Sequence, residues 1–237
     1  MEKFKCERLS ADICNKERIQ SFRCERNINL EEYLLEEAWE EDESGRNAIY
    51  IILDKNHDDD VVMYFGLKCG MISCPFATDI YKLLDANNDT LLFNMPDDKL
   101  EALFYIKEFI DKADRESEIN KVAETLSGIE LSHFCVNSHY KRLRRNEGID
   151  TSGMGEYFFY KEIYPIVELV RTYIGCKFLY LFAADGSDTQ SLVRYYEDVL
   201  GFMNLNDYDK SLTDDREVVP IMPYYDYQCK FMLMPLS

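Results

Sequence analysis

Residues 148–160 read GIDTSGMGEYFFY, and the prediction of the fold starts from this stretch. Gly153 and Gly155 flank one residue, and bulky aromatics then open a long apolar-periodic segment. The first amides of a helix have no intrahelical partners, and the helix dipole favours negative charge there. Glycines also let the backbone approach a phosphate closely. The stretch therefore predicts an anion site at a helix start, and the simpler alternative is a turn whose glycines only pack the helix.

The residues just upstream strengthen the anion interpretation. HYKRLRR, residues 139–145, is the densest basic cluster of the chain and runs into the glycine loop. Neither common phosphate motif is present, because no G-x-x-x-x-G-K-[ST] occurs and Phe158 stands where the dinucleotide fingerprint needs its third glycine. ATP hydrolysis and NAD binding are therefore disfavoured, and a different polyphosphate ligand is expected.

Composition narrows the class of protein. The 237 residues are 46% hydrophobic, and no apolar run reaches the roughly 18 residues that a membrane helix needs. The charged N-terminus, MEKFKCERLS, lacks the apolar core of a signal peptide, so we expect a cytoplasmic protein whose eight cysteines stay reduced. The three histidines form no His/Cys cluster at ligand spacing, so no metal is expected.

The formal net charge is −18, from 45 acidic and 27 basic residues. Such a field repels phosphate backbones, which makes nucleic-acid binding an unfavoured function, and it would attract a cationic amine. The charge could equally serve solubility alone.

The N-terminal half predicts a strand at 4–9 and an acidic amphipathic helix at 30–43, capped by Asn29 and ended by Gly45. Residues 47–53 and 61–68 are rich in β-branched and aromatic residues, so they predict an antiparallel hairpin, with the second strand able to run on to Ile72. The apolar pattern at about 77–128 predicts a helical insertion.

The C-terminal half predicts a strand–loop–helix–strand unit. A strand at 128–137, the loop at 148–155, a helix at 156–174 and a buried strand at 176–183 would make the two strands parallel. Pro165 must kink that helix or shift its hydrogen bonding. A helix at 188–200 and a closing strand at 225–236 follow. We therefore predict one mixed α/β domain over 1–237.

The order of these elements resembles the GNAT N-acetyltransferases, the Gcn5-related superfamily, over residues 128–202. In that family a V-x-P-x-[YF]-[RK]-like run precedes [QR]-x-x-G-x-[GA], a helix, a buried strand, and a helix ending in Y-x-x-x-G-F. This chain has VNSHYK at 136–141, DTSGMG at 150–155, CKFLYLFA at 176–183 and YYEDVLGF at 195–202. The resemblance implies a mostly antiparallel central sheet with one parallel strand pair.

The chain departs from the family pattern at three places. Asp150 stands where the family has Gln or Arg, and Arg144 or Arg145 would compensate for it. About nine extra residues separate Val136 from Gly153. The segment from Tyr196 to Phe202 is one residue longer than Y-x-x-x-G-F.

The resemblance also implies the site residues. Acetyl-CoA would be the cosubstrate, and direct transfer of its acetyl group to a primary amine would be the reaction. Tyr196 is the expected general acid, with Tyr195 as the alternative, and Glu130 or His133 is the expected general base, although a structural role for His133 is the simpler interpretation. The residues expected to bind the cofactor are Phe134, Cys135, Val136, Arg144, Arg145, Thr151, Ser152, Gly153, Met154, Gly155 and Thr189.

Three functions remain open. The first is an N-acetyltransferase for a small-molecule or peptide amine, whose acceptor would be selected by the 30–43 helix, the insertion and an acidic, aromatic segment at 214–228. The second is a GNAT-fold interaction module without catalysis, which binds a basic protein partner. The third is a toxin that acetylates aminoacyl-tRNA, which would require HYKRLRR to form the RNA-facing patch. The oligomeric state is open, with a homodimer as one option.

Overall fold

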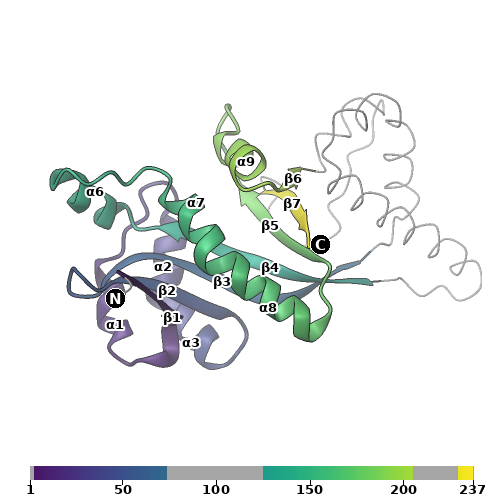
Figure 1. The fold of residues 1–237 in the computed structure, drawn as a ribbon, viewed down its shortest axis with the longest axis horizontal. Helices are drawn as coiled ribbons and strands as arrows, with labels where there is room; N and C mark the ends of the chain where they lie inside the picture. The colour runs from purple at the N-terminus through teal and green to yellow at the C-terminus, as the bar shows by residue number, and fades with distance from the viewer. Residues whose placement is uncertain (1–2, 74–124, 205–228, 237) are drawn as a thin grey trace, which may run out of the picture. The chain divides into compact units, whose positions relative to one another are not determined.

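The structure is a computed structural model that describes residues 3–73, 125–204 and 229–236. Contacts divide the chain into two compact units, each built from two segments (Figure 1). The N-terminal unit comprises Met1–Cys69 and Glu130–Val167, and the C-terminal unit comprises Gly70–Ile129 and Glu168–Ser237. The expectation of one domain over 1–237 stays a prediction.

An antiparallel sheet forms the N-terminal unit. β1 (Phe4–Arg8) pairs with β2 (Ala48–Asp54), and β2 pairs with β3 (Asp60–Ser73) around the polar turn between them. Their β-branched and aromatic side chains fit a pleated, buried surface. The expected strand and hairpin are thus confirmed, and β3 extends to Ser73.

Short helices pack on this sheet. They are α1 (Asn15–Arg18), α2 (Ile28–Glu36) and α3 (Ala38–Glu43). Alternate residues of a strand point to the same face, so Ile49, Ile51 and Leu53 of β2 share one face. They form a buried core together with residues of the helices, β3 and β4, including Leu9, Phe22, Leu34, Ala38, Val61, Tyr64 and Cys135.

The helix predicted at 30–43 is two helices, so that prediction was wrong in its continuity and its cap. Glu37 separates α2 from α3, and the cap of α2 is Asn27, whose side chain accepts from the amide of Asn29. Gly45 does end the second helix, with a φ of 73° that favours glycine.

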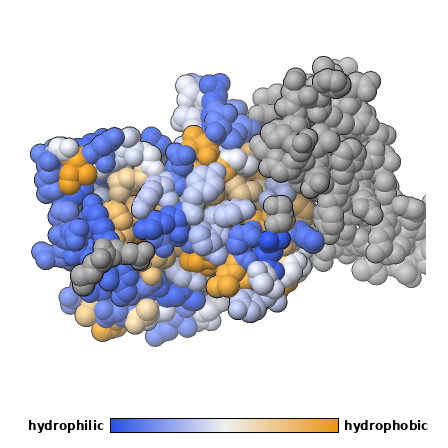
Figure 2. Space-filling view, viewed as in Figure 1, coloured by the Kyte–Doolittle hydropathy of each residue, from blue (hydrophilic) through white to orange (hydrophobic). Residues whose placement is uncertain are grey.

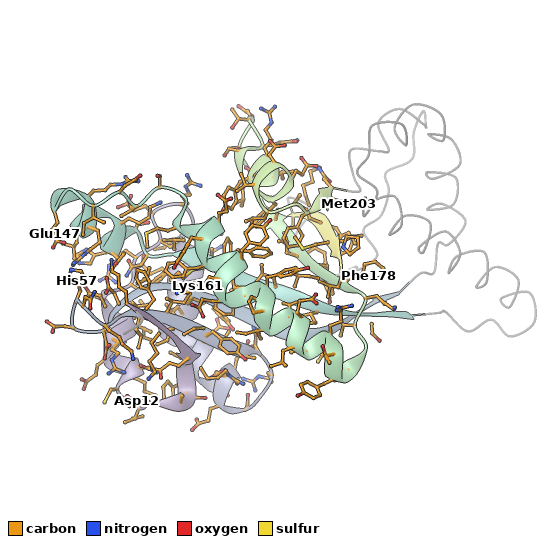
Figure 3. All side chains as sticks on the ribbon, viewed as in Figure 1. Asp12, His57, Glu147, Lys161, Phe178 and Met203 are labelled. Atoms are coloured by element: carbon orange, nitrogen blue, oxygen red, sulfur yellow. The ribbon has the colours of Figure 1, made fainter. Side chains whose placement is uncertain are left out.

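The basic cluster forms a helix that the sequence pattern did not indicate. β4 (Thr125–Val136) is followed by Asn137, which is the N-cap of α6 (Ser138–Asn146). With nine residues, α6 accounts for the extra length before the glycine loop. Its end is tied to the β2–β3 turn, because His57 Nε2 lies 3.9 Å from a Glu147 carboxylate oxygen (Figure 3).

The helix after the glycine loop is continuous but irregular. α7 (Met154–Phe158) passes through a π-helical turn at Phe159–Ile163 into α8 (Tyr164–Ile174), as the unbroken ribbon in Figure 1 shows. Pro165 has no amide hydrogen, and a π-helical turn shifts the hydrogen bonding just before it. The expected disturbance at Pro165 is confirmed, and Gly175 ends the helix with a φ of 68°.

Three strands and one helix of the described residues lie wholly within the C-terminal unit. β5 (Phe178–Ala184) and β6 (Met203–Asn204) both pair antiparallel with β7 (Cys229–Pro235). α9 (Ser191–Arg194) continues into a π-helical turn at Tyr195–Val199 and ends before Gly201. The helix thus begins later than residue 188, and the sequence pattern did not indicate β6.

The ring of Tyr180 on β5 lies close to one glycine of β3 and one glycine of β4. A Cβ on Gly70 would lie 1.8 Å from Tyr180 Oη, and one on Gly128 would lie 3.1 Å from the same ring. Both distances are shorter than an ordinary van der Waals contact, so neither position has room for a side chain. Gly70 and Gly128 are therefore kept small by the close approach of the Tyr180 ring.

The strand order is β1-β2-β3-β4-β5-β7-β6. The chain leaves β4, forms α6 to α8 and returns beside it as β5, which gives the one parallel pair in an otherwise antiparallel sheet. The predicted mixed α and β class is confirmed. The insertion at about 77–128, apart from its last residues in β4, and the acidic segment at 214–228 lie outside the described residues.

The face of the described residues that Figure 2 shows is mostly hydrophilic, with scattered apolar residues between. Among the helices that the structure describes, none has both the length and the apolar character that a bilayer crossing needs.

Candidate functional site

The glycine loop presents a helix start in the N-terminal unit. Gly153 precedes α7 with a φ of 66°, and nothing lies within 4 Å of where its Cβ would be. Ser152 and Gly153 are exposed, and Met154 and Gly155 are partly exposed. The first-turn amides of α7 are those that a helix leaves without intrahelical partners. The loop can therefore offer backbone donors to an anion.

Asp150 is turned onto its own loop. Its carboxylate accepts from the Ser152 amide at 2.8 Å and from the Ser152 hydroxyl at 2.9 Å. These bonds hold the pKa of Asp150 below its usual value, so its charge remains but is satisfied locally. One loop amide is thereby taken by Asp150, while the amides of the first turn of α7 are not.

The two arginines named for this loop have different environments. Arg144 is buried at 5% exposure, and its guanidinium lies 3.4 Å from Asp60 and 3.0 Å from Glu147. Arg145 is exposed, and its Nε donates to the hydroxyl of buried Thr151 at 2.9 Å. Arg145 is thus the guanidinium beside the loop, and Arg144 joins α6 to the β2–β3 turn.

Two further cations accompany Arg145. The pKa of Lys141 is lowered by burial and by the positive charges of Arg145 and Arg26. In the described part of the chain, no ion pair joins Arg26, Lys141 or Arg145 to an acidic side chain. The sequence analysis missed Arg26, because more than a hundred residues separate it from Lys141, whose pKa its charge lowers in the folded chain. We call Arg26, Lys141 and Arg145 the cation cluster.

The strand residues expected along the cofactor lie at the end of β4. Phe134 packs edge-on against Phe159 of the π-helical turn, with ring centroids 6.3 Å apart. Cys135 is buried, and Val136 is partly buried. This strand end and the helix start are thus joined by direct aromatic packing within the N-terminal unit.

The two base candidates have unlike surroundings. Glu130 is 2% exposed, and Lys68 Nζ lies 3.1 Å from its carboxylate. His133 stacks on Tyr33 with ring centroids 3.8 Å apart, and its Nδ1 lies 3.1 Å from the Ser132 hydroxyl. Burial, with a smaller contribution from Lys68, lowers the pKa of His133 to about 4. Its imidazole is therefore neutral at pH 7.

The acid candidates lie in the C-terminal unit. Tyr196 is 6% exposed and packs edge-on against Phe202, whereas Tyr195 is partly exposed. The amide of Leu200 donates to the carbonyl of Tyr195, five residues back, as in a π-helical turn. Such a turn uses one more residue than an α-helical turn. The turn accommodates the extra residue between Tyr196 and Gly201. Tyr196 therefore fits the tyrosine position of the Y-x-x-x-G-F pattern better than Tyr195 does.

Thr189 lies on an exposed turn before α9. The N-cap residue of α9 is Gln190, but it is the carboxylate of Asp185 that accepts from the first amides of the helix, from Leu192 at 2.6 Å and from Val193 at 3.1 Å. The sequence analysis missed this role, because Asp185 stands several residues before the helix. Among the described residues, no group of three or more His, Cys, Asp or Glu side chains is arranged to hold a metal.

The N-terminal part of the site fits a polyphosphate. It combines an open glycine in a left-handed conformation, a helix start and the cation cluster, in a chain whose formal net charge is −18. The locally bonded Asp150 does not remove these donors. The adenosine diphosphate part of a coenzyme A thioester is a ligand with this chemistry.

Comparisons with known proteins agree with this architecture. No protein-family model matches the sequence, and no curated protein matches it either. Solved structures do match. AtaTR bound with AcCoA is 13% identical and has a TM-score of 0.57, with 99% of this chain and 95% of that chain covered.

Two further matches belong to the toxin AtaT. A tyrosine-to-phenylalanine mutant of AtaT is 11% identical, has a TM-score of 0.55 and covers 98% of this chain and 89% of its own. AtaT complexed with acetyl-methionyl-tRNAfMet is 12% identical, has a TM-score of 0.51 and covers 98% and 94%. At these identities the likeness establishes the fold, and the chain therefore has the fold of the GNAT N-acetyltransferases.

Proposed function

We propose that this protein is an acetyl-CoA-dependent N-acetyltransferase that moves an acetyl group directly to a primary amine. The observation that carries the proposal is the glycine loop at a helix start beside the cation cluster, in a fold shared with toxin structures bound to acetyl-CoA. Bound acetyl-CoA would supply the acetyl group as a reactive thioester.

The N-terminal unit would bind the cofactor. The backbone amides at the start of α7 would hold its pyrophosphate, with Arg145 and Lys141 supplying charge. The backbone of Phe134 to Val136 would pair with the pantetheine arm. Thr151 would orient Arg145, because the Thr151 hydroxyl accepts a hydrogen bond from Arg145 Nε at 2.9 Å.

Tyr196 would protonate the leaving thiolate. A phenol with a pKa near ~10 is matched to a thiolate of similar basicity. The π-helical turn supports Tyr196 over Tyr195, since it accounts for the longer spacing to Gly201. For the base, both candidates stay open. The Glu130 carboxylate is ionised beside Lys68, and the His133 ring is neutral but stacked on Tyr33.

Calorimetry of acetyl-CoA binding tests the cofactor site. Gly153→Asp should weaken binding at least tenfold, because it places a carboxylate at the loop. Gly45→Asp is a matched control, since Gly45 has a similar φ of 73° and equally open space at its Cβ position. Equal weakening by both variants, or no binding by the wild type to acetyl-CoA, longer acyl-CoAs or CoA, would overturn the proposal. The interaction module would then be the better interpretation.

The acid is tested by turnover. Tyr196→Phe should lower kcat by roughly a hundredfold with little change in acetyl-CoA affinity, because general acid catalysis contributes factors of that order. Tyr195→Phe should retain most activity. A larger loss of kcat in Tyr195→Phe than in Tyr196→Phe would assign the general-acid role to Tyr195.

Aminoacyl-tRNA is a second candidate acceptor. Two observations favour it: a fold neighbour is AtaT complexed with acetyl-methionyl-tRNAfMet, and the cation cluster places three positive side chains together in a very acidic chain. Other neighbours contain an antitoxin segment or DNA, so a protein or nucleic-acid partner fits this fold as well as a small amine does.

A screen of acceptors distinguishes aminoacyl-tRNA from a small-molecule or peptide amine as the acceptor. Labelled acetyl-CoA would be offered with aminoacyl-tRNA, a polyamine and a lysine peptide. Transfer to aminoacyl-tRNA alone, with toxicity on expression that Tyr196→Phe suppresses, would establish the tRNA acceptor. Transfer only to free amines would exclude it.

A further inference from the structure

Two cysteines of the N-terminal unit touch each other. The sulfur atoms of Cys24 and Cys135 are 3.0 Å apart, although 111 residues separate them in sequence. Both residues are 6% exposed. Neither thiol has a part in the proposed acetyl transfer, where Cys135 would contribute only its backbone.

The backbones on either side of this thiol pair are tied together. The amide of Ser138 donates to the carbonyl of Arg23 at 2.8 Å, and the amide of Arg23 donates to the Asn137 side chain at 3.2 Å. The amide of Glu25 donates to the Ser138 hydroxyl at 3.2 Å. A disulfide has sulfur atoms about 2.05 Å apart, so side-chain movement of about 1 Å suffices to form one.

Cys24 lies in the wall of a surface pocket of about 500 Å³, and Cys135 is not among the residues that line this pocket. The other residues that line this pocket are Arg23, Glu25, Ile28, Glu31 and Arg142. A small oxidant entering the pocket therefore meets Cys24 first.

The polar contacts around Cys24 favour its reactive form. The hydrogen bond from the Cys135 thiol, followed by the backbone amides of Asn27 and Arg26, lowers the pKa of Cys24 to about 6, against the opposing effect of burial. The same hydrogen bond and burial raise the pKa of Cys135. Because the thiolate is the nucleophile, Cys24 is the attacking sulfur and Cys135 is the resolving one.

We propose that Cys24 and Cys135 are a modification site at which a peroxide forms a reversible intramolecular disulfide. The Cys24 thiolate attacks one peroxide oxygen, the O–O bond breaks, and hydroxide leaves and is protonated to water. The sulfur of Cys135 then attacks the Cys24 sulfenic acid, and its proton departs with the hydroxyl group as a second water. Two thiols are oxidised by two electrons, and one hydrogen peroxide is reduced to two waters.

The disulfide would also stabilise the folded chain. Linking residues so far apart in sequence restricts the unfolded state, and the pre-existing contact between the sulfurs keeps strain in the folded state small. Oxidation should therefore raise the melting temperature, and a dithiol reductant should reverse both the bond and the shift.

Peptide mapping after peroxide treatment tests the proposal. The reduced full chain would be treated with hydrogen peroxide, alkylated and digested without reductant. We expect a cross-linked peptide pair containing Cys24 and Cys135, an intact mass lower by two hydrogens, and loss of both on reduction. In Cys135→Ala, Cys24 should instead accumulate as a sulfenic acid that dimedone captures.

The control is Cys14→Ser, which removes an exposed cysteine outside the pair and should leave the cross-link unchanged. Cross-links that use other cysteines, or oxidation of Cys24 to a sulfinic acid without the Cys135 bond, would overturn the proposal. The wild-type map decides the matter even if a variant does not fold. Acetyl-CoA binding is not part of the readout, so failure here is distinct from failure of the acetyltransferase proposal.

Discussion

His133 illustrates how one neighbourhood sets the chemistry of a residue. Its ring stacks on Tyr33 of α2, and the Tyr33 hydroxyl donates to Glu41 at 2.8 Å and accepts from Asn47 at 3.2 Å. Burial lowers the pKa of His133 to about 4. A side chain that the sequence presents as a base candidate is therefore a neutral aromatic partner in a polar network.

This lowered pKa predicts a loss of stability in mild acid. An unfolded histidine titrates near pH ~6.5, so between that value and about 4 the unfolded state binds more protons than the folded state. The free energy of unfolding should fall as the pH is lowered through this window, by at most about 3 kcal/mol, with no further loss from this group below it. Urea unfolding of the wild type from pH 7 to 4 measures the slope.

The control is His133→Gln, whose side chain does not titrate. Its stability should depend less on pH between 6.5 and 4 than that of the wild type. Identical slopes for the two proteins would contradict the assignment.

Among the elements, α6 depends most clearly on one residue at its start. Asn137 is 2% exposed, and its side-chain oxygen accepts from the amides of His139 at 3.0 Å and Tyr140 at 3.3 Å. Its side-chain nitrogen donates to the carbonyl of Val61 at 2.7 Å. One amide side chain thus caps α6, anchors the helix to β3 and receives the Arg23 amide.

Asn137→Ala should therefore destabilise the protein more than loss of an ordinary cap. We expect about 3 kcal/mol, from the lost cap and from a Val61 carbonyl left without its donor. Asn27→Ala is the matched control, because Asn27 caps α2 through one bond to the Asn29 amide and should cost about 1 kcal/mol. Chemical denaturation of both variants measures the difference, and equal losses would show that the Asn137 contacts beyond the cap contribute nothing.

For the whole molecule, the dominant electrostatic property is its excess of acidic residues. The formal net charge is −18, and exposed acidic side chains cover α2 and α3, including Glu32, Glu36, Glu40 and Glu43. Repulsion among like charges disfavours the compact state. The cation cluster is a local exception beside the glycine loop.

Salt should therefore stabilise this protein. Raising the salt concentration from about 20 to about 200 mM shortens the screening length from roughly 20 to roughly 7 Å, which weakens the repulsion. The melting temperature should rise by a few degrees, and sodium chloride and potassium chloride should act alike. A fall in melting temperature, or an effect of one cation only, would show that local ion pairs or specific binding outweigh the net charge.

Much of the fold was predictable from local patterns. β-branched and aromatic residues indicated β2 and β3, the apolar run indicated β5, and Pro165 indicated the disturbance that precedes α8. The ordered series of strand, glycine loop, helix and strand indicated the GNAT fold. These features depend on residues close together in sequence, so periodicity and turn chemistry reveal them.

Only the tertiary structure decided which distant groups meet. It anchored the start of α6 to β3 through Asn137, buried Arg144 beside Asp60, and brought Arg26 near Lys141 and Cys24 against Cys135. These contacts join residues more than seventy positions apart, and no local periodicity encodes them. Local sequence patterns therefore indicated most strands, the glycine loop and their order, but not α6, β6 or the break in the 30–43 helix. Burial and long-range packing settled which charges are paired, which stay exposed and which thiols touch.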